Sequence, residues 1–275
     1  KIFFNLKKVI IIGSGIAGLA ASIRLISKGF DVEIFESNSF PGGKISSFNL
    51  GKYRFDAGPS LFTMPHFVDE LFLLTGEDPR KYFNYKKKDI SCKYFWEDGT
   101  KLSAFSNKNK FAHEVEKKLG VSKFNFLNYL DKAKKKYDLT KSIFLEKSLH
   151  KLSTYLSKDI LKGILNLNIF QIEKTLNKVN EIELKEPHLV QLYNRFATYN
   201  GSSPYQTPGM MTLIQHLEQE YGTFVVEKGI IEIVNSLYKL AKKKGVVFNF
   251  NKNVSKILVK ENKAIGVEAD NQKFY

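Results

Sequence analysis

The 275-residue sequence contains a single cysteine, Cys92, and only five histidines. One cysteine cannot build a framework of disulfide bonds or a zinc site made from several thiolates. No two histidines have the spacing of a metal-binding pair, and the motifs H-E-x-x-H and G-x-S-x-G are both missing. These absences exclude a disulfide-stapled secreted domain and argue against a zinc enzyme or a serine hydrolase. Cys92 falls on a predicted strand, where we expect a small buried side chain.

Long hydrophobic runs are also missing from the sequence. Apolar runs such as Val9–Ile12 contain only a few residues, whereas a membrane-spanning helix needs about 20. The run that follows Lys7 and Lys8 is short and continues into glycine, which is not typical of a secretory signal. The sequence therefore predicts neither a membrane-spanning helix nor a signal peptide.

The overall composition is that of a soluble globular protein. Hydrophobic residues make up 43% of the sequence and charged residues 26%, which excludes disordered, collagen-like and coiled-coil classes for the whole chain. The length predicts one or two domains and is sufficient for a sizeable core without disulfides or metals.

Positive charge is in clear excess, because 43 lysines and arginines face 28 acidic residues and give a formal net charge of +15. Such a charge could attract nucleic acid or the surface of an anionic membrane. The lysines are dispersed, however, and their densest groups are short triplets such as Lys86–Lys88 and Lys134–Lys136. We therefore expect a solvated basic surface and no nucleic-acid partner. A weak attraction to anionic membranes stays open.

The N-terminal segments alternate in the manner of a βαβ unit. Lys8–Gly13 predicts a buried parallel strand, Ala17–Lys28 an amphipathic helix, and Asp31–Phe35 a second short strand. After them, Ser47–Phe55 predicts a hairpin or bent strand, because turn residues interrupt it, and Pro65–Thr75 predicts a helix.

The remaining pattern predicts a helical insertion and a return to the α/β unit. Segments 90–96 and 101–105 flank an Asp-Gly turn and predict a hairpin, and residues 107–222 are mainly helical in pattern, with Ile160, Ile164 and Leu167 at helical spacing. A helix at 230–244 and strands at 246–250, 254–260 and 264–269 follow. The predicted fold class is α/β, a Rossmann-like domain at 1–75 and 222–275 with a mixed, largely helical domain at 76–221 inserted.

The first chemical motif is the run Gly13-Ser14-Gly15-Ile16-Ala17-Gly18, which fits G-x-G-x-x-G between a strand and a helix. Gly13 allows a tight turn, Gly15 lets a pyrophosphate approach the backbone, and Gly18 lets the helix pack close to the strand. The helix N-terminus offers free N–H groups to the phosphates. Glu36, at the end of the second strand, can accept hydrogen bonds from a ribose hydroxyl. The run predicts a dinucleotide site but does not distinguish FAD from NAD.

Two further segments favour FAD through a family resemblance. Pro41-Gly42-Gly43-Lys44 and the following serines resemble the G-G-R-x-x-[ST] segment of the FAD-dependent amine oxidase and desaturase superfamily, with lysine in place of arginine. Phe55–Ser60, F-D-A-G-P-S, is similar to the F-D-x-G-P-[ST] signature of bacterial carotenoid desaturases of the phytoene type. In that family this segment approaches the flavin.

Later segments extend the resemblance over the rest of the chain. Arg195–Tyr205 is similar to the R-[YF]-A-T-Y-x-G-x-x-P-[YF] segment of these desaturases and is closest to the branch that acts on hydroxylated carotenoids at the 3,4 position. In the segment 225–230, Lys228 stands where the family has its first glycine. Val254 corresponds to a strand residue whose backbone meets the adenine, although a valine there could equally be core.

The resemblance implies FAD as the cofactor and assigns no catalytic residue and no metal. It implies the following FAD-binding residues: Gly13, Ser14, Gly15, Ile16, Ala17, Gly18, Glu36, Ser37, Gly42, Gly43, Lys44, Ala57, Gly58, Pro59, Ser60 and Val254. Asp56 could act as an acid or base, but we prefer a role in fixing the turn at 57–59. The sequence does not begin with Met, ends in a strand-like pattern at 271–275 and lacks the family's glycine-rich C-terminal flavin segment, so we expect an N-terminal fragment.

The resemblance also implies an activity, which is FAD-dependent desaturation of phytoene or of a hydroxylated carotenoid. The substrate is lipophilic, so the resemblance further implies a cytoplasmic enzyme that contacts the inner face of the cytoplasmic membrane peripherally. Two alternatives within the superfamily are a carotenoid isomerase and an FAD-dependent amine oxidase. A further alternative is a protein without enzymatic activity that binds a partner and holds no cofactor.

Overall fold

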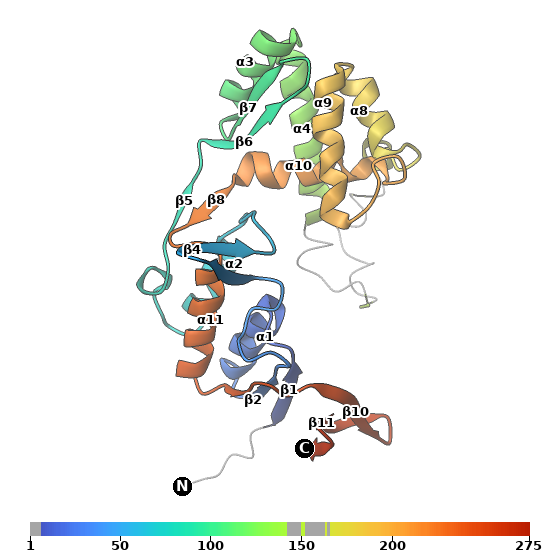
Figure 1. Cartoon of the computed structure of the whole chain (residues 1–275). Coiled ribbons are helices and arrows are strands. Elements are labelled where there is room, and N and C mark those ends of the chain that lie inside the picture. The colour runs from blue at the N-terminus through green and yellow to red at the C-terminus, as the bar shows by residue number, and fades with distance from the viewer. Residues whose placement is uncertain (1–6, 142–149, 152–162, 164–165) are drawn as a thin grey trace. The chain divides into compact units, whose positions relative to one another are not determined.

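A computed structural model describes residues 7–141, 150–151, 163 and 166–275. The chain divides into two compact units, one built from residues up to Lys87 and from Phe224 onward, the other from Lys88–Thr223. Each unit has its own hydrophobic core, and each is described separately below (Figure 1). Ile160 and Ile164, which the sequence places on a helix face, lie outside the described residues.

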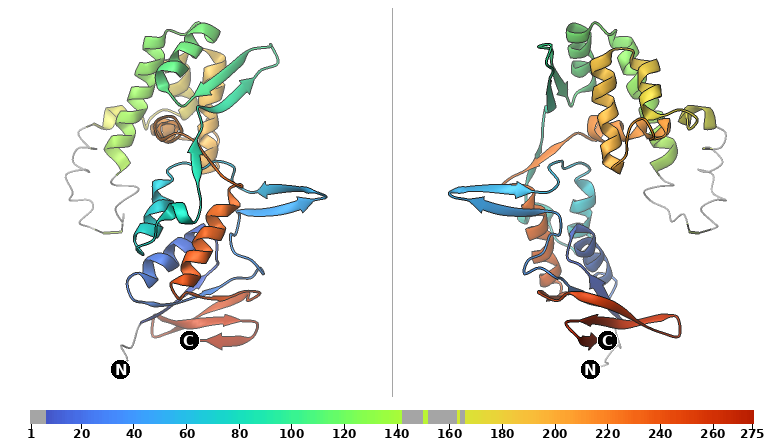
Figure 2. Two further views of the ribbon diagram at one scale, coloured as in Figure 1. Left: turned by 90° about the vertical axis from the view of Figure 1, so that its left-hand side faces the viewer. Right: turned by 45° about the vertical axis from the view of Figure 1, so that its right-hand side comes forward.

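The first unit is centred on a three-stranded parallel sheet in the order β1-β2-β9. The strands are β1 (Lys8–Ile12), β2 (Asp31–Phe35) and β9 (Val247–Asn249). The helices α1 (Ile16–Ile26) and α11 (Ile231–Lys243) lie side by side, and α2 (His66–Leu73) completes the helical layer (Figure 2). The predicted βαβ unit is therefore confirmed, with its boundaries within two residues of those expected.

Side-chain alternation along β2 explains the layers of this unit. Val32 and Ile34 point into the main core with α1 and α11, whereas Phe35 packs against Val267 and Ala269 in a smaller cluster. That second face is covered by an antiparallel sheet of β10 (Val254–Lys260), β11 (Lys263–Ala269) and β12 (Gln272–Phe274). Successive residues of a strand face opposite sides, so one strand serves both layers. The sequence predicted β10 and β11, and the strand-like pattern at 271–275 corresponds to β12.

Two short antiparallel pairs complete the first unit. The hairpin of β3 (Ser46–Leu50) and β4 (Tyr53–Ala57) extends away from the helical layer, as both views of Figure 2 show. The three-residue strands β5 (Tyr85–Lys87) and β8 (Phe224–Val226) pair with each other. The sequence did not predict the pairing of β5 with β8. A one-turn 3-10 helix, η1 (Pro79–Lys81), lies between α2 and β5.

The second unit is mainly helical and carries one hairpin, as the sequence predicts for its described residues. Its hairpin is β6 (Ile90–Phe95) with β7 (Lys101–Phe105), and Gly99 takes the positive φ of +86° in the turn. The longer helices are α3 (Lys108–Leu119), α4 (Lys123–Lys141), α8 (Leu176–Leu184) and α9 (Pro187–Asn194). The shorter ones are α7 (Leu167–Phe170), η3 (Arg195–Asn200), η4 (Gly209–Leu213), α10 (Ile214–His216) and η5 (Leu217–Tyr221).

The core of the second unit is rich in aromatic side chains. Phe111 of α3 and Phe126 of α4 meet edge to face with ring centroids 5.2 Å apart, and Tyr129 meets Tyr193 at 5.0 Å. Cys92 of β6 is only partly buried and packs at the edge of this core, so the expectation of a fully buried cysteine was wrong.

Candidate functional site

The loop between β1 and α1 needs glycine at two positions for reasons internal to the protein. Gly13 has a φ of +93°, a conformation that residues with a Cβ rarely adopt. A Cβ on Gly18 would lie 2.0 Å from the carbonyl oxygen of Gly13, so only glycine allows α1 to pack this closely on the loop. Both requirements agree with the roles expected from the sequence.

Gly15 is different, because the protein itself leaves room for a side chain there. Its φ of −65° is ordinary, and a Cβ would meet only the Cα of Gly43, at 3.9 Å. An open space at this position, beside the start of α1, is what a ligand that approaches the backbone would need. Gly15 is therefore the glycine of this loop that the fold alone does not explain.

The N-terminus of α1 is available to an anion. Gly15 is its N-cap, no side chain caps the helix, and the first turn contains no acidic residue. The N–H groups of Ile16, Ala17 and Gly18 fall in this first turn, where a helix has no internal acceptors for its N–H groups. These N–H groups lie at the positive end of the helix dipole, which favours the binding of a phosphate.

Glu36 follows β2 and is buried, with 5% of its surface exposed. Its Oε2 accepts hydrogen bonds of 2.8 Å from both the backbone N–H and the hydroxyl of Ser14. Its Oε1 accepts from the backbone N–H and the side-chain amide of Asn38, each at 2.9 Å, and from the Ser37 hydroxyl at 3.2 Å. Burial alone would raise the pKa of Glu36, but these hydrogen bonds outweigh it and lower the pKa below its usual value.

The second glycine segment lies directly against the first. Gly42 and Gly15 form a parallel bridge, and the N–H of Gly42 donates to the Ser14 carbonyl at 3.0 Å. A Cβ on Gly43 would come within 3.2 Å of the Gly15 Cα. The turn at 42–43 therefore forms one wall of the space beside Gly15. The side chain of Lys44 is exposed.

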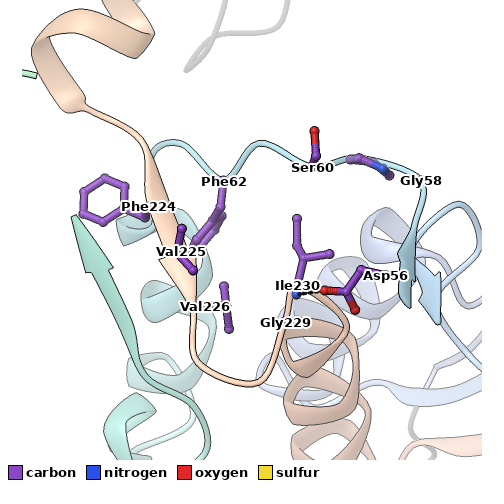
Figure 3. Close-up of a pocket in the computed structure, with 10 residues that line it drawn as sticks. Asp56, Gly58, Ser60, Phe62, Phe224, Val225, Val226, Gly229 and Ile230 are labelled. Carbon is purple, nitrogen blue, oxygen red and sulfur yellow. Dashed lines mark hydrogen bonds between the residues drawn. The ribbon is translucent and has the colours of Figure 1, made fainter. Parts of the chain in front are cut away.

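The third segment, Ala57–Ser60, joins the same assembly through Gly58. Gly58 has a φ of +92°, and a Cβ there would lie 1.8 Å from the Lys44 carbonyl oxygen. Residues 58–60 then line a cavity of about 180 Å³ in the first unit, together with residues of β8 and of the turn that precedes α11 (Figure 3). Phe62 and Phe224 contribute aromatic walls to this cavity. The structure thus brings together all three segments singled out in the N-terminal sequence.

Asp56 holds the far wall of this cavity and not the turn that follows it in sequence. Its Oδ2 accepts the backbone N–H of Ile230 at 3.0 Å, and Figure 3 shows the carboxylate directed at the start of α11. Its Oδ1 lies 3.3 Å from Nη1 of Arg54. The preferred role of Asp56 in fixing the turn at 57–59 is therefore corrected, because its hydrogen bonds stabilise the turn at 228–230.

Arg54 is a partner that sequence reasoning missed. Its guanidinium donates to the carbonyl of Lys228, so Arg54 and Asp56, two residues apart on β4, bind the same turn. Lys228 has a φ of +65°, a conformation that favours glycine, the residue that the resembling family segment has at this position. A Cβ on Gly229 would meet the Asp56 Oδ2 at 2.2 Å, so this glycine is required for the contact.

Val254 begins β10, where it pairs with Ala269 and packs against the small core around Phe35. The backbone that lies against Glu36 belongs to the residues just before it. The N–H of Lys252 donates to the Glu36 carbonyl at 2.9 Å, and the Glu36 N–H donates to the Asn249 carbonyl at 2.9 Å. The β9–β10 connection is thus the neighbour of Glu36, and Val254 itself is a core residue whose predicted adenine contact stays a prediction.

Two searches within the described parts of the chain gave no candidates. There, no helix combines the length and apolar character needed to cross a bilayer. No group of three His, Cys, Asp or Glu side chains in the same residues is arranged to hold a metal ion.

Comparison with known proteins places this geometry in context. A family model described as flavin containing amine oxidoreductase matches residues 16–274. A 1-hydroxycarotenoid 3,4-desaturase from Flavobacterium sp. (strain P99-3) is 50% identical over 265 residues, which cover 96% of this chain and 54% of that protein. A 4,4'-diapolycopene oxygenase from Methylomonas sp is 30% identical over 267 residues, which cover 96% of this chain and 53% of that protein.

Among solved structures, an oxidoreductase from Methanosarcina mazei aligns with a TM-score of 0.60 at 17% identity, over 97% of this chain and 56% of that one. At this identity the likeness concerns the fold. The predicted α/β fold class and the resemblance drawn from the motifs are both confirmed. The chain spans about half the length of the curated relatives it matches.

Proposed function

Because this chain belongs to the family of flavin-containing amine oxidoreductases, we propose that the protein is an FAD-dependent desaturase that introduces double bonds into a carotenoid precursor. The observation that carries the choice of substrate is the 50% identity, over 96% of this chain, with a protein named 1-hydroxycarotenoid 3,4-desaturase. The proposal favours a hydroxylated carotenoid over phytoene for the same reason. The first unit would bind the cofactor and the second unit would bind the substrate.

The cofactor is assigned to the first unit because its residues fit the parts of FAD. In this proposal the pyrophosphate lies in the open space beside Gly15 and receives hydrogen bonds from the first turn of α1. Gly42 and Gly43 form the opposite wall, and Lys44 supplies a point charge near the phosphates or ribose. Glu36 accepts a ribose hydroxyl, in exchange for one of the hydrogen bonds that it accepts from Ser37 and Asn38 in the structure.

The cavity lined by residues 58–60 and by Gly229 and Ile230 is proposed as the end of the site that would hold the reacting ring. When bound there, FAD supplies a two-electron acceptor for the two hydrogens removed from adjacent carbons of the polyene. Gly58 and Pro59 bring backbone close to that space, and Phe62 and Phe224 exclude water from it. Arg54 and Asp56 position the turn that forms the far wall. None of these residues is assigned as a proton donor or acceptor.

A second candidate activity is oxygen insertion into a carotenoid end group. It is favoured by the 30% identity with a protein named 4,4'-diapolycopene oxygenase over 96% of this chain. Carotenoid isomerisation and amine oxidation are the further alternatives within the family. The three carotenoid activities differ in the mass or the absorption of their products, so one experiment separates them, and an amine oxidase would leave both carotenoids unchanged.

The test expresses the full-length gene in cells that accumulate phytoene and, separately, in cells that accumulate a 1-hydroxylated carotenoid. Pigments are extracted and analysed by absorption and by mass. Loss of two hydrogens with a red shift from the hydroxylated substrate is the expected result. A gain of oxygen would support the oxygenase, a spectral change at constant mass the isomerase, and no change in either pigment would contradict the carotenoid assignment.

Contact with a membrane is part of the proposal, because a carotenoid substrate dissolves in lipid. The formal net charge of +15 would favour an anionic surface over a neutral one, and the proposed location is the inner face of the cytoplasmic membrane. Sedimentation of the full-length protein with anionic vesicles, but not with neutral vesicles, is the expected result. Equal sedimentation with both would show that charge does not guide the contact, and none with either would remove this part of the proposal.

A further inference from the structure

The second unit contains a cavity of about 490 Å³, which is in the range of small-molecule sites. Helices α4 and α10 and the segments η3, η4 and η5 contribute its walls. Most of the walls are apolar, and Met210, Met211, Leu213, Ile214 and Leu217 line them. Flexible methionine side chains adapt to irregular hydrocarbon shapes. By its walls alone, this cavity suits a hydrocarbon.

Polar side chains line the rest of the cavity, namely those of Tyr137, Thr140, Lys141, Tyr199 and Asn200. Among them, Tyr199 contacts an ion pair whose carboxylate is buried. The Tyr199 side chain lines the cavity, and its hydroxyl donates a hydrogen bond to the Glu218 carboxylate. Only 6% of the Glu218 side chain is exposed, and Nη2 of Arg195 lies 2.8 Å from its Oε2. Nη1 of the same guanidinium is 3.4 Å from Oε1. Cζ of Arg195 lies over the Phe196 ring, 4.6 Å from its centroid, which is within the range of a cation–π contact.

The buried carboxylate determines what the Tyr199 hydroxyl can offer to a ligand. A phenol has one proton, and here Glu218 receives it. Burial, followed by the hydrogen bond to Glu218, raises the pKa of Tyr199, so the hydroxyl keeps this proton at neutral pH. The lone pairs of the oxygen are then the part that remains for a ligand, and they accept hydrogen bonds. The position therefore favours a ligand that can donate a proton, such as an alcohol, over a ketone or a hydrocarbon.

We propose that this cavity binds the hydroxylated end group of the polyene substrate, with the Tyr199 oxygen accepting a hydrogen bond from the substrate hydroxyl. The proposal rests on the proposed function, because it names the subsite that would select a hydroxylated carotenoid. The apolar side chains match the hydrocarbon part of this end group, and the Tyr199 oxygen matches its alcohol. Glu218 and Arg195 act as positioning residues, because they orient the Tyr199 hydroxyl without lining the cavity.

The test uses the full-length flavoprotein, two polyenes and two variants. The polyenes are a 1-hydroxylated carotenoid and the same carbon skeleton without the hydroxyl. Tyr199→Phe removes the acceptor and keeps the ring. Tyr53→Phe is the matched control, because Tyr53 lies in the first unit with 61% of its surface exposed. Dissociation constants come from the change in the visible absorption of each polyene on binding, and kcat/KM is measured for both polyenes.

Tyr199→Phe is expected to weaken binding of the hydroxylated polyene about two- to tenfold, the range for one hydrogen bond, and to leave binding of the unhydroxylated polyene unchanged. Tyr53→Phe should change neither. Equal effects of Tyr199→Phe on both polyenes, or no effect on either, would overturn the subsite, and thermal unfolding verifies that the variant is folded. A wild-type enzyme that converts neither polyene would instead overturn the proposed function, and the subsite with it.

Discussion

Glu36 and Ser14, 22 residues apart, are joined by two hydrogen bonds of 2.8 Å from the backbone and the hydroxyl of Ser14 to one carboxylate oxygen. The end of β2 is thereby tied to the glycine loop that precedes α1. The loop is held in shape by the same side chain that is proposed to bind the ribose. Glu36 therefore has a structural role as well as a proposed role in binding.

Replacement of Glu36 by Gln should destabilise the first unit by about 1–3 kcal/mol, because the new amide group would face donors of Ser14 or Asn38 and leave a buried polar group unpaired. Glu36 has a lowered pKa in the folded state relative to the usual 4.5. Its contribution is therefore fully present above pH 4.5 and is lost as the pH falls through the lower folded value. Urea unfolding of both proteins at several pH values measures the difference. If the difference in free energy of unfolding between the wild type and Glu36→Gln did not shrink in acid, this account of Glu36 would be contradicted.

Gly15→Ala and Gly18→Ala should affect different properties. A Cβ at Gly15 meets only the Gly43 Cα at 3.9 Å, whereas one at Gly18 meets the Gly13 carbonyl at 2.0 Å. Gly18→Ala should cost about 1–3 kcal/mol of stability through overpacking. Gly15→Ala should leave stability nearly unchanged but push the pyrophosphate away from the N–H groups of α1.

Loss of a hydrogen bond to a charged group costs about 1.5–3 kcal/mol, so Gly15→Ala should raise the Kd for FAD about tenfold or more. Titration of the apoprotein of the full-length chain with FAD, followed by flavin fluorescence, gives the Kd. Tight FAD binding by a stable Gly15→Ala variant would mean that the pyrophosphate does not lie beside Gly15.

Asp56→Ala should loosen the turn at 228–230, because the N–H of Ile230 loses its 3.0 Å acceptor and Arg54 loses its carboxylate partner. The loss should resemble that of a helix cap, about 1 kcal/mol. Asp56→Asn keeps an acceptor and should cost less. FAD retention during gel filtration of the full-length protein should fall in the order wild type, Asp56→Asn, Asp56→Ala. If Asp56→Asn abolished turnover while it kept both stability and FAD, Asp56 would have a chemical role instead.

His188 should act as a pH-sensitive group next to Trp96 in the second unit. Its ring lies 4.7 Å from the Trp96 ring, and the hydrogen bond with Glu186, followed by the charge of Asp98, raises the pKa of His188 above 6.5. The stabilising effect of protonation is therefore present below pH 6.5 and is lost as the pH rises through the raised folded value.

The fluorescence of Trp96 reports this titration, because an imidazolium quenches indole emission more strongly than a neutral imidazole does. Emission from the folded protein should increase with a midpoint above pH 6.5, and His188→Gln should remove this step. A midpoint at or below 6.5 in the wild-type protein would show that Glu186 and Asp98 do not stabilise the charged ring.

Local patterns in the sequence predicted much of the fold and singled out the segments of the candidate cofactor site. The βαβ unit follows from a buried apolar strand, a helical period and a closing glycine, all within 30 residues. The three segments were also recognisable, because each contains glycine at positions where few other residues fit. Their contacts with one another, Gly43 against Gly15 and Gly58 against Lys44, came only from the structure.

The parts that sequence reasoning missed depend on contacts between distant residues. Arg54 and Lys228 are 174 residues apart, and no local pattern in either segment indicates the partner. The strands β5 and β8 have three residues each, too few to show alternation. The environment of Tyr199 was missed for a similar reason, because the sequence shows neither that Glu218 is buried nor that it contacts Tyr199.

Anaerobic mixing of the full-length flavoprotein with a 1-hydroxylated carotenoid tests the central claim most directly. The visible absorption of the oxidised flavin and the absorption of the polyene are recorded together in a single turnover. We predict that the flavin absorption bleaches in proportion to the enzyme, while the polyene absorption shifts to longer wavelength and its mass falls by two hydrogens. A flavin that stays oxidised while the polyene is unchanged, or is changed at constant mass, would contradict the assignment as a desaturase.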